Sequence, residues 1–340
     1  MNQFNFPRIS VIVAVYNREG FIENCLDSVL KQTVDDYEVI VVDDGSMDQT
    51  RKILEKYKQH SNVTVFFHRT NRGLMCSRNT GIGLSRGDFI AFTDSDCIVQ
   101  ENWLEELSKP FILNQDIVIV GGKILDPPSK NYWELVNRGS NFIAHQSCYV
   151  QEIIGCNMAF RRQFLIENPF DTTFNYCAGD DVDVCFRARQ IKKLIYFTNS
   201  ARVIHYHRSQ LKNTLRQQFG YGFMRVYVNL KYSKFPFVNW GTVLIVLSLL
   251  LACVGILLKD NLSLKFATMT LLLYLGLILY LCYRSKEGNL LFSLYSFPGQ
   301  LIASSANCCG NVFYFIRKIL NSFMAKGGGP GFYQNASKNI

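Results

Sequence analysis

Phe89-Ile90-Ala91-Phe92-Thr93-Asp94-Ser95-Asp96 is the stretch that decides the fold. Its largely apolar first half predicts a buried strand, so Asp94 and Asp96 fall at the carboxyl end of that strand. In α/β proteins, ligands bind at this edge of the sheet. Two carboxylates placed there repel each other unless a cation lies between them, and their hard oxygen atoms suit Mg²⁺ or Mn²⁺. An isolated Asp-x-Asp triplet is usually a solvated turn, so the rest of the chain has to supply the context.

Three further apolar runs precede this stretch, and a helical pattern follows each of them. We expect strands at 9–15, 37–42 and 63–68, with helices at 21–31, 48–59 and 77–85. Alternation at this spacing predicts a parallel sheet with helices on both faces, in which every strand-to-helix turn lies on one edge. The acidic and glycine-rich turns should therefore meet in one crevice.

The pattern changes after Asp96. A helix is expected at 103–113 and a short strand at 117–120, and the segment up to residue 149 is irregular and aromatic. Gly179-Asp180-Asp181-Val182-Asp183 opens another helix. Two short strands, expected at 194–198 and 201–204, lead to His205 and His207.

The net charge of +9 is unevenly distributed along the 340 residues. No acidic residue occurs between Asp183 and Asp260, whereas basic residues accumulate there. Residues 238–258 and 266–283 are uncharged and long enough to cross a bilayer, which needs about 20 residues. By the positive-inside rule the basic stretch places the N-terminal domain in the cytoplasm, on a multi-pass protein of the plasma membrane. Because the basic stretch adjoins a membrane helix, we favour anionic lipid or substrate phosphates over nucleic acid as its partner.

The remaining parts of the chain complete the predicted organisation. Residues 290–316 are uncharged but interrupted by Pro298, so they form a third span, a re-entrant piece or an interfacial helix. The tail at 326–340 is expected to be disordered. The polar residues 1–8 run into the first strand, so no signal peptide is expected. The 11 cysteines have no Cys-x-x-Cys spacing and are expected to be reduced.

Seven stretches, in this order, resemble the family 2 glycosyltransferases of the GT-A fold: 10–17, 41–48, 71–81, 87–96, 155–162, 179–187 and His205. The resemblance covers roughly residues 8–225. It implies an α/β nucleotide-diphospho-sugar transferase domain with a Rossmann-like mixed sheet, followed here by C-terminal transmembrane helices. The expected division is a catalytic domain at 1–225, a basic and aromatic linker at 226–237, and the membrane segments named above.

The resemblance also assigns roles to residues in the matched stretches. Asp96 is implied as the direct metal ligand, with Asp94 contacting the ribose or the metal through water, and His205 completes the Mn²⁺ or Mg²⁺ site. His207 is a close rival for the histidine. Either Asp43 or Asp44 reads the base of the donor. Donor contacts are further implied for Val15, Asn17, Arg78, Ser95 and Asn157, with Arg78 facing the diphosphate beside Asn71 and Gly73.

Asp180-Asp181 occupies the place of the family's Glu-Asp pair, whose second carboxylate is the general base. Transfer with inversion needs one carboxylate to take the proton of the acceptor hydroxyl as its oxygen attacks the anomeric carbon. A position at a helix N-terminus should keep Asp181 ionised. The alternative is that Asp180, Asp181 and Asp183 are merely acidic residues in the first turn of a helix, with no catalytic role.

Processive members of the family carry a Gln-x-x-Arg-Trp motif, which is absent from residues 216–222. We therefore expect a metal-dependent inverting enzyme that moves one sugar from a nucleotide donor, UDP-linked by preference, to a lipid-linked or other saccharide acceptor near the membrane. A polyprenyl-phosphate glycosyltransferase is the nearest alternative, and a catalytically silent membrane scaffold of the same fold is another. A nucleotidyltransferase is disfavoured, since residues 15–20 hold one glycine instead of a glycine- and arginine-rich phosphate loop. Sequence leaves the oligomeric state open.

Overall fold

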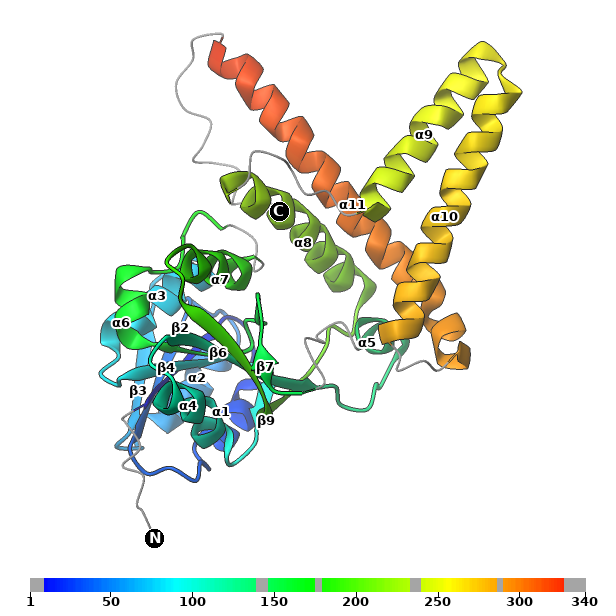
Figure 1. Ribbon diagram of the computed structural model, residues 1–340. Helices are drawn as coiled ribbons and strands as arrows, with labels where there is room; N and C mark the ends of the chain where they lie inside the picture. Colours follow the sequence, from blue (N-terminus) through cyan, green and yellow to red (C-terminus); the bar gives the residue numbers. More distant parts are fainter. Residues whose placement is uncertain (1–8, 139–145, 175–178, 233–239, 286–289, 327–340) are drawn as a thin grey trace. The chain divides into compact units, whose positions relative to one another are not determined.

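The computed structural model describes residues 9–138, 146–174, 179–232, 240–285 and 290–326 (Figure 1). The chain forms two compact units. The first comprises Met1–Pro128 and Asn141–His207, and the second comprises Ser129–Ser140 and Arg208–Ile340. The predicted domain boundary at residue 225 therefore falls inside the second unit.

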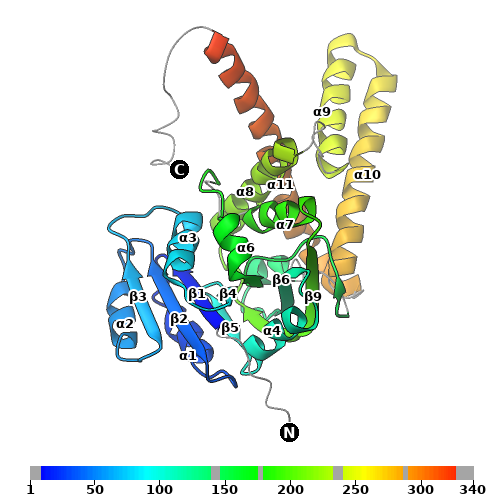
Figure 2. The same ribbon diagram turned by 60° about the vertical axis from the view of Figure 1, so that its left-hand side comes forward.

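The first half of unit 1 alternates strands with helices, as predicted. In chain order these are β1 (Ile9–Val15), α1 (Ile22–Val29), β2 (Tyr37–Asp43), α2 (Thr50–Tyr57), β3 (Val63–Phe67), α3 (Leu74–Leu84) and β4 (Phe89–Thr93). The strands β3, β2, β1 and β4 lie side by side and run parallel (Figure 2). The residues of β1, β2 and β4 are almost all buried, as expected of a parallel sheet covered on both faces, whereas β3 at the edge of the sheet is partly exposed.

Alternate side chains of β1 supply a core on each face of the sheet. Val11 and Val13 share one apolar core with Ile22 and Leu26 of α1. Ile12 points to the opposite face, where α3 approaches closely at Gly81. A period of two along the strand places successive side chains on opposite faces, which is why one apolar run serves both cores.

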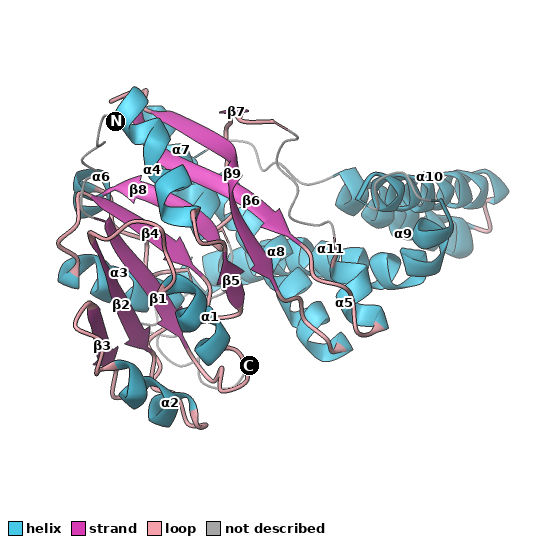
Figure 3. Ribbon diagram, turned by 90° about the horizontal axis from the view of Figure 1, so that it is seen from below, coloured by secondary structure: helices cyan, strands magenta, loops and turns pink. Residues whose placement is uncertain are grey.

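The second half of unit 1 makes the sheet mixed. It contains β5 (Cys97–Val99), α4 (Trp103–Leu113), β6 (Ile117–Leu125), β7 (Cys148–Tyr149), β8 (Asn157–Arg161), α6 (Arg162–Glu167), α7 (Asp180–Gln190) and β9 (Leu194–His205). The sheet order is β3-β2-β1-β4-β8-β6-β9-β5, with β7 also paired to β9 (Figure 3). β8 is antiparallel to β4 and β6, whereas β9 is parallel to β6 and antiparallel to β5.

The two short strands expected at 194–198 and 201–204 form one strand, β9. The register with β6 shifts between Gly122 and Lys123, which face Thr198 and Arg202 respectively. The extra residues between Thr198 and Arg202 form a bulge that leaves the strand continuous on both sides. The polar residues Asn199 and Ser200 within the bulge explain the break in the apolar pattern.

Unit 2 is helical in the part that the structure describes. Its helices are α5 (Tyr132–Asn137), α8 (Leu211–Tyr232), α9 (Trp240–Leu258), α10 (Asn261–Ser285) and α11 (Leu290–Lys326). α8 packs along α11, and α9 along α10. Gly222 and Gly310 allow close approach of α8 and α11, because a Cβ at either position would overlap a backbone carbonyl oxygen of the other helix.

One helix among the described residues is long and apolar enough to cross a membrane: the segment Asn261–Leu281 of α10, with a mean hydropathy of 1.9. It overlaps the predicted span 266–283. The apolar part of α9, Thr242–Leu258, is shorter. Residues 290–316 lie within one continuous helix that includes Pro298. Part of the predicted linker, 233–237, and the tail 327–340 lie outside the described residues.

Candidate active site

The turns after β1 and β2 hold each other at the carboxyl edge of the sheet. The backbone N–H of Asp44 donates to the carbonyl of Val15 at 2.8 Å. Asn17 has a φ of 50°, a left-handed conformation that asparagine adopts more readily than most residues. Its N–H donates to Oγ of Ser46 at 2.9 Å, and its Oδ1 accepts from the N–H of Met47 at 2.8 Å. These contacts give Val15 and Asn17 a bracing role, and their predicted contacts with a donor remain predictions.

Asp44 ties the β2 turn to the loop before α3. Its two carboxylate oxygens accept from the backbone N–H groups of Arg72, at 2.9 Å, and Gly73, at 2.8 Å. His68 lies 2.7 Å from the same carboxylate through Nδ1, and its Nε2 lies 3.0 Å from Oγ1 of Thr80. Gly73 has a φ of 90°, which suits glycine.

Asp43 has weaker contacts than Asp44. Its carboxylate accepts from the N–H of Ser46 at 3.2 Å and lies 3.5 Å from Nε of Arg51. Both carboxyl groups are buried. The choice of base reader between Asp43 and Asp44 therefore remains open.

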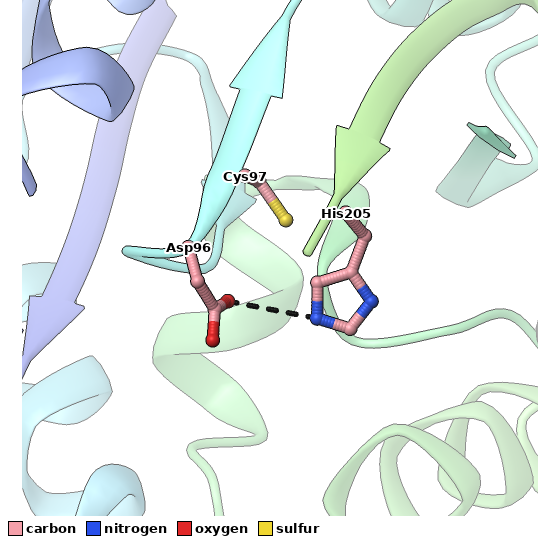
Figure 4. A group of neighbouring side chains, drawn as sticks. All are labelled: Asp96, Cys97 and His205. Atoms are coloured by element: carbon pink, nitrogen blue, oxygen red, sulfur yellow. Dashed lines mark ion pairs between the residues drawn. The ribbon is translucent and has the colours of Figure 1, made fainter. Parts of the chain in front are cut away.

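Asp96 and His205 face each other at the same edge, although they are far apart in sequence (Figure 4). Oδ1 of Asp96 lies 3.5 Å from Nε2 of His205, and Oδ2 lies 3.6 Å from Nε of Arg18. Ligand atoms of Asp96, His205 and the intervening Cys97 all lie within 4.8 Å of one another. Ligands bonded to one ion at about 2.0–2.3 Å have such spacings, so these side chains fit a dication.

His207 points elsewhere. Its Nε2 lies 2.5 Å from Oδ1 of Asp126, and its ring meets that of His205 edge to face with centroids 5.3 Å apart. Of the two histidines, His205 is therefore the one that faces Asp96. His207 buttresses it.

Asp94 contacts Arg78 of α3. Its Oδ1 accepts from Nη2 of Arg78 at 3.3 Å, and its side chain is 36% exposed. Partial burial, only partly offset by the charge of Arg78, raises the pKa of Asp94, and the charge of Asp96 adds to the shift. Ser95 is buried in the turn between the two acids. Metal contact by Asp94 and donor contact by Ser95 stay predictions.

The surroundings of His205 favour its charged form in the absence of a metal. Burial by itself lowers the pKa of the ring, but Cys156, Asp96 and Asp94 act in the opposite direction and raise it to about 10. A cation bound at Asp96 would compete with this proton, because a ligating histidine must be neutral.

Arg78 links Asp94 to Asp180, which precedes the predicted general base. Its guanidinium donates to Oδ2 of Asp180, to Oδ1 of Asp94 and to the carbonyl of Gly155. Two aromatic rings flank it, those of Phe92 and Phe170. With a side chain only 4% exposed, Arg78 is a buried cross-link between three segments. Its predicted contact with the diphosphate stays a prediction.

Asp181 lies in the first turn of α7, next to Asp180 and the Gly155 loop. Its Oδ2 accepts from the N–H of Gly155 at 3.0 Å, and its Oδ1 accepts from the N–H of Val182 at 2.8 Å. We expected the helix N-terminus to keep this acid ionised. Instead, burial and the charge of Asp180 outweigh these N–H donors and raise the pKa of Asp181 to about 7.

Asn157 is hydrogen-bonded inside the protein, and its predicted contact with the donor stays a prediction. Its Oδ1 accepts from Nε1 of Trp103 at 2.8 Å, and its Nδ2 donates to the carbonyls of Lys123 and Ala201, each at 3.0 Å. Its residue is 1% exposed. Both amide hydrogens are used inside the protein, so the side chain fastens β8 to its neighbours.

Sequence reasoning missed several residues of this edge. Arg18 faces Asp96, His68 faces Asp44, and Cys97 lies beside His205. The available signal was position: Arg18 lies in the turn after β1, His68 directly follows β3, and Cys97 pairs with the last residue of β9.

Comparison with known proteins bears on the family and the fold. Residues 10–168 match the family described as Glycosyl transferase family 2. The chain carries a family 2 glycosyltransferase domain. EpsH of Bacillus subtilis is 42% identical to it over 113 residues, which are 33% of each chain. The chain thus spans about a third of the length of its first curated relatives, EpsH and EpsJ.

Two further likenesses extend beyond the family 2 domain. The glucosyl-dolichyl phosphate glucuronosyltransferase of Haloferax volcanii is 25% identical over 248 residues, 67% of this chain and 79% of that protein. The mannosyltransferase PcManGT of Pyrobaculum calidifontis, solved with GDP-Man and Mn²⁺, superposes with a TM-score of 0.57 and 20% identity, covering 88% of this chain and 87% of that one. The latter likeness concerns the fold, which is the GT-A fold predicted from the motifs.

Proposed function

We propose that this protein is a metal-dependent inverting glycosyltransferase that moves a sugar from a nucleotide donor to a lipid-linked acceptor near a membrane. One observation carries the proposal. The Asp96–His205 pair, 3.5 Å apart, and the Asp180–Asp181 pair are joined at one sheet edge through Arg78 and its bond to Asp94. Cation-binding groups and a proton acceptor are the two components that such a transfer requires.

Each residue has a defined task in this proposal. Asp96 and His205 hold the metal, which when bound offsets the negative charge of the leaving diphosphate. Asp181 accepts the proton of the acceptor hydroxyl as that oxygen attacks the anomeric carbon, and the sugar inverts its configuration. Asp180, held by Arg78, raises the basicity of Asp181 through its charge. Asp43 and Asp44 hold the β2 turn where the base of the donor would lie.

Donor and acceptor are proposed from different sources. The resemblance favours a UDP-sugar, whereas PcManGT was solved with GDP-Man, so the base has to be tested. The acceptor follows from the dolichyl-phosphate relative and from the apolar segment Asn261–Leu281. The absence of Gln-x-x-Arg-Trp from residues 216–222 supports transfer of one sugar per acceptor.

The first experiment identifies the donor. The full chain, purified in detergent, is heated with a panel of UDP- and GDP-sugars in the presence and absence of Mn²⁺. A ligand that binds the folded state alone raises the unfolding temperature. Stabilisation by one nucleotide class that depends on Mn²⁺ supports the proposal, and no stabilisation by any nucleotide sugar contradicts it.

The second experiment tests the base. Asp181→Asn should lower turnover of the identified donor by about 10²–10⁴-fold, the usual contribution of a general base, while nucleotide binding is retained. Equal turnover in the variant would remove Asp181 from the mechanism. A wild type that binds nucleotide but turns over no donor with any acceptor would indicate the silent scaffold.

The third experiment separates the acceptors. Polyprenyl phosphate and a polyprenyl-diphosphate-linked saccharide are offered in parallel, with product followed by mass spectrometry. Transfer to the saccharide supports the proposal. Transfer to the bare lipid phosphate would replace it with a polyprenyl-phosphate glycosyltransferase.

A further inference from the structure

Strand register places Cys97 beside His205. β5 and β9 are antiparallel, and Cys97 lies directly opposite His205 in their register. Directly opposite residues of an antiparallel pair have their side chains on the same face, with Cβ atoms about 4.5–5.5 Å apart. The backbone, and not a chance side-chain rotamer, therefore brings sulfur and imidazole together.

The sulfur points into the cation-binding group. Sγ of Cys97, a carboxylate oxygen of Asp96 and a ring nitrogen of His205 lie within 4.8 Å of one another (Figure 4). Cys97 is 1% exposed, so this thiol is shielded from solvent. Cys156 is also buried.

The sulfur of Cys97 differs in chemical character from the carboxylate oxygens of the two aspartates that the sequence singled out. Carboxylate oxygens suit Mg²⁺ and Mn²⁺, whereas thiolate selects softer cations. A set of one oxygen, one nitrogen and one sulfur leaves a fourth position open for water or a substrate oxygen, and that arrangement suits tetrahedral Zn²⁺ or Co²⁺.

We propose that Cys97, with Asp96 and His205, forms a site for a thiophilic dication such as Zn²⁺ or Co²⁺. As the metal–sulfur bond forms, the thiol of Cys97 releases its proton to solvent, and no electron is transferred. Binding itself does not depend on the proposed glycosyl transfer. Its consequence does: Zn²⁺ held by three protein ligands competes with the Mn²⁺ that the transfer requires.

Cobalt reports on the sulfur directly, since a thiolate bound to Co²⁺ gives a charge-transfer band in the near ultraviolet that oxygen and nitrogen ligands do not give. The metal-free full chain is titrated with Co²⁺ in the absence of donor. We expect the band to saturate at one Co²⁺ per chain, and to disappear when Zn²⁺ is added in excess.

Cys97→Ser should remove the band and weaken Zn²⁺ binding by about tenfold or more, the scale of loss seen even for residues behind a ligand. The matched control is Cys148→Ser, because Cys148 is an exposed thiol outside this group and its loss should leave the band unchanged. Circular dichroism checks that both variants are folded.

The outcomes separate this inference from the proposed function. Co²⁺ bound without the band, or a band that survives in Cys97→Ser, overturns it, whether or not the enzyme transfers sugar. If Cys97→Ser does not fold, Cys97→Ala is used, and a wild type that lacks the band is already decisive. A band with no Mn²⁺-dependent turnover leaves the inference intact and contradicts the proposed function alone.

Discussion

A single guanidinium, that of Arg78, neutralises two acids that come from distant parts of the chain. Asp94 precedes β5, and Asp180 begins α7; both bond to Arg78, whose side chain is 4% exposed. Removing one member of a buried ion pair leaves the other charge without compensation. Arg78 therefore contributes to folding as well as to the arrangement of the site.

We predict that Arg78→Gln lowers the free energy of unfolding by about 3–5 kcal/mol, the usual cost of breaking a buried pair. The control is Lys58→Ala, whose exposed pair with Glu55, 2.8 Å apart, should contribute about 0–1 kcal/mol. Urea unfolding of both variants measures the difference. Equal losses in the two variants would mean that Arg78 is not a structural cross-link.

We also predict an acid limb in the pH profile. Because the pKa of Asp181 is raised to about 7, kcat/KM should fall about tenfold per pH unit below 7, where the base is protonated, and level off above it. Nucleotide affinity, measured at each pH with saturating Mn²⁺, is the control, because Asp181 does not contact the nucleotide in the proposed arrangement. A profile that is flat between pH 5 and about 8 would contradict the assignment.

The raised pKa of Asp181 also makes the stability of the protein depend on pH. The pKa of Asp181 in the folded protein lies above the ordinary aspartate value of 3.8, so between these two values the folded state holds a proton that the unfolded chain has lost. This contribution to stability is present in full below about 4 and is lost as the pH rises through about 7. Asp181→Asn should remove that part of the pH dependence.

At the scale of single residues, the sequence predicted where the site residues lie better than which residues they contact. Asp96, His205 and the Asp180–Asp181 pair were placed at strand ends and a helix start, and the fold brings those points to one edge. The sequence could not predict that Asn157 accepts a hydrogen bond from Trp103, because that bond joins side chains 54 positions apart. Cys97 was overlooked since only the pairing of β5 with β9 gives it a neighbour.

Between elements, α3 approaches β1 closely at Gly81. A Cβ on Gly81 would lie 2.5 Å from Cγ2 of Ile12, whose side chain is fully buried. Gly83, two residues further along the same helix, has open space around it. Because both glycines lie in one helix, comparing their replacement by alanine separates the effect of packing from that of helix propensity.

We predict that Gly81→Ala destabilises the protein by about 1–3 kcal/mol through overpacking. Gly83→Ala should instead be neutral or stabilise it by about 0.4–1 kcal/mol, because alanine restricts the unfolded chain. The midpoints of urea unfolding test both. Similar changes in the two variants would show that α3 does not approach β1 as described.

Periodicity predicted the parallel half of the sheet because each strand there is largely apolar. It was less informative for the antiparallel half. β9 carries a polar bulge in mid-strand, and β7 is two residues long, so neither has a clear pattern. Their strand character comes from pairing with distant partners, which local sequence does not report.

For the whole molecule, α10 carries the membrane prediction. Leu272 and Leu273 are 63% and 55% exposed, although leucine prefers burial. If this segment lies in a bilayer, replacing both with arginine should cost about 2.5–3.5 kcal/mol per charge and reduce the fraction of protein that floats with vesicles. Leu113→Arg is the control, at an 85% exposed leucine of unit 1. Flotation equal to that of the wild type in the double variant would show that α10 is outside the bilayer.

The route of the chain between its two units limits how such a protein can be assembled from parts. The backbone crosses three times, since Ser129–Ser140 lies between two portions of unit 1 in sequence yet belongs to unit 2. Within unit 2, the hydroxyl of Tyr132 accepts from the N–H of Gly299, and the carbonyl of Val136 accepts from Gln300. A gene fusion with one breakpoint cannot exchange the helical region and keep these bonds. Modular recombination in this lineage would need α5 and α11 to be inherited together.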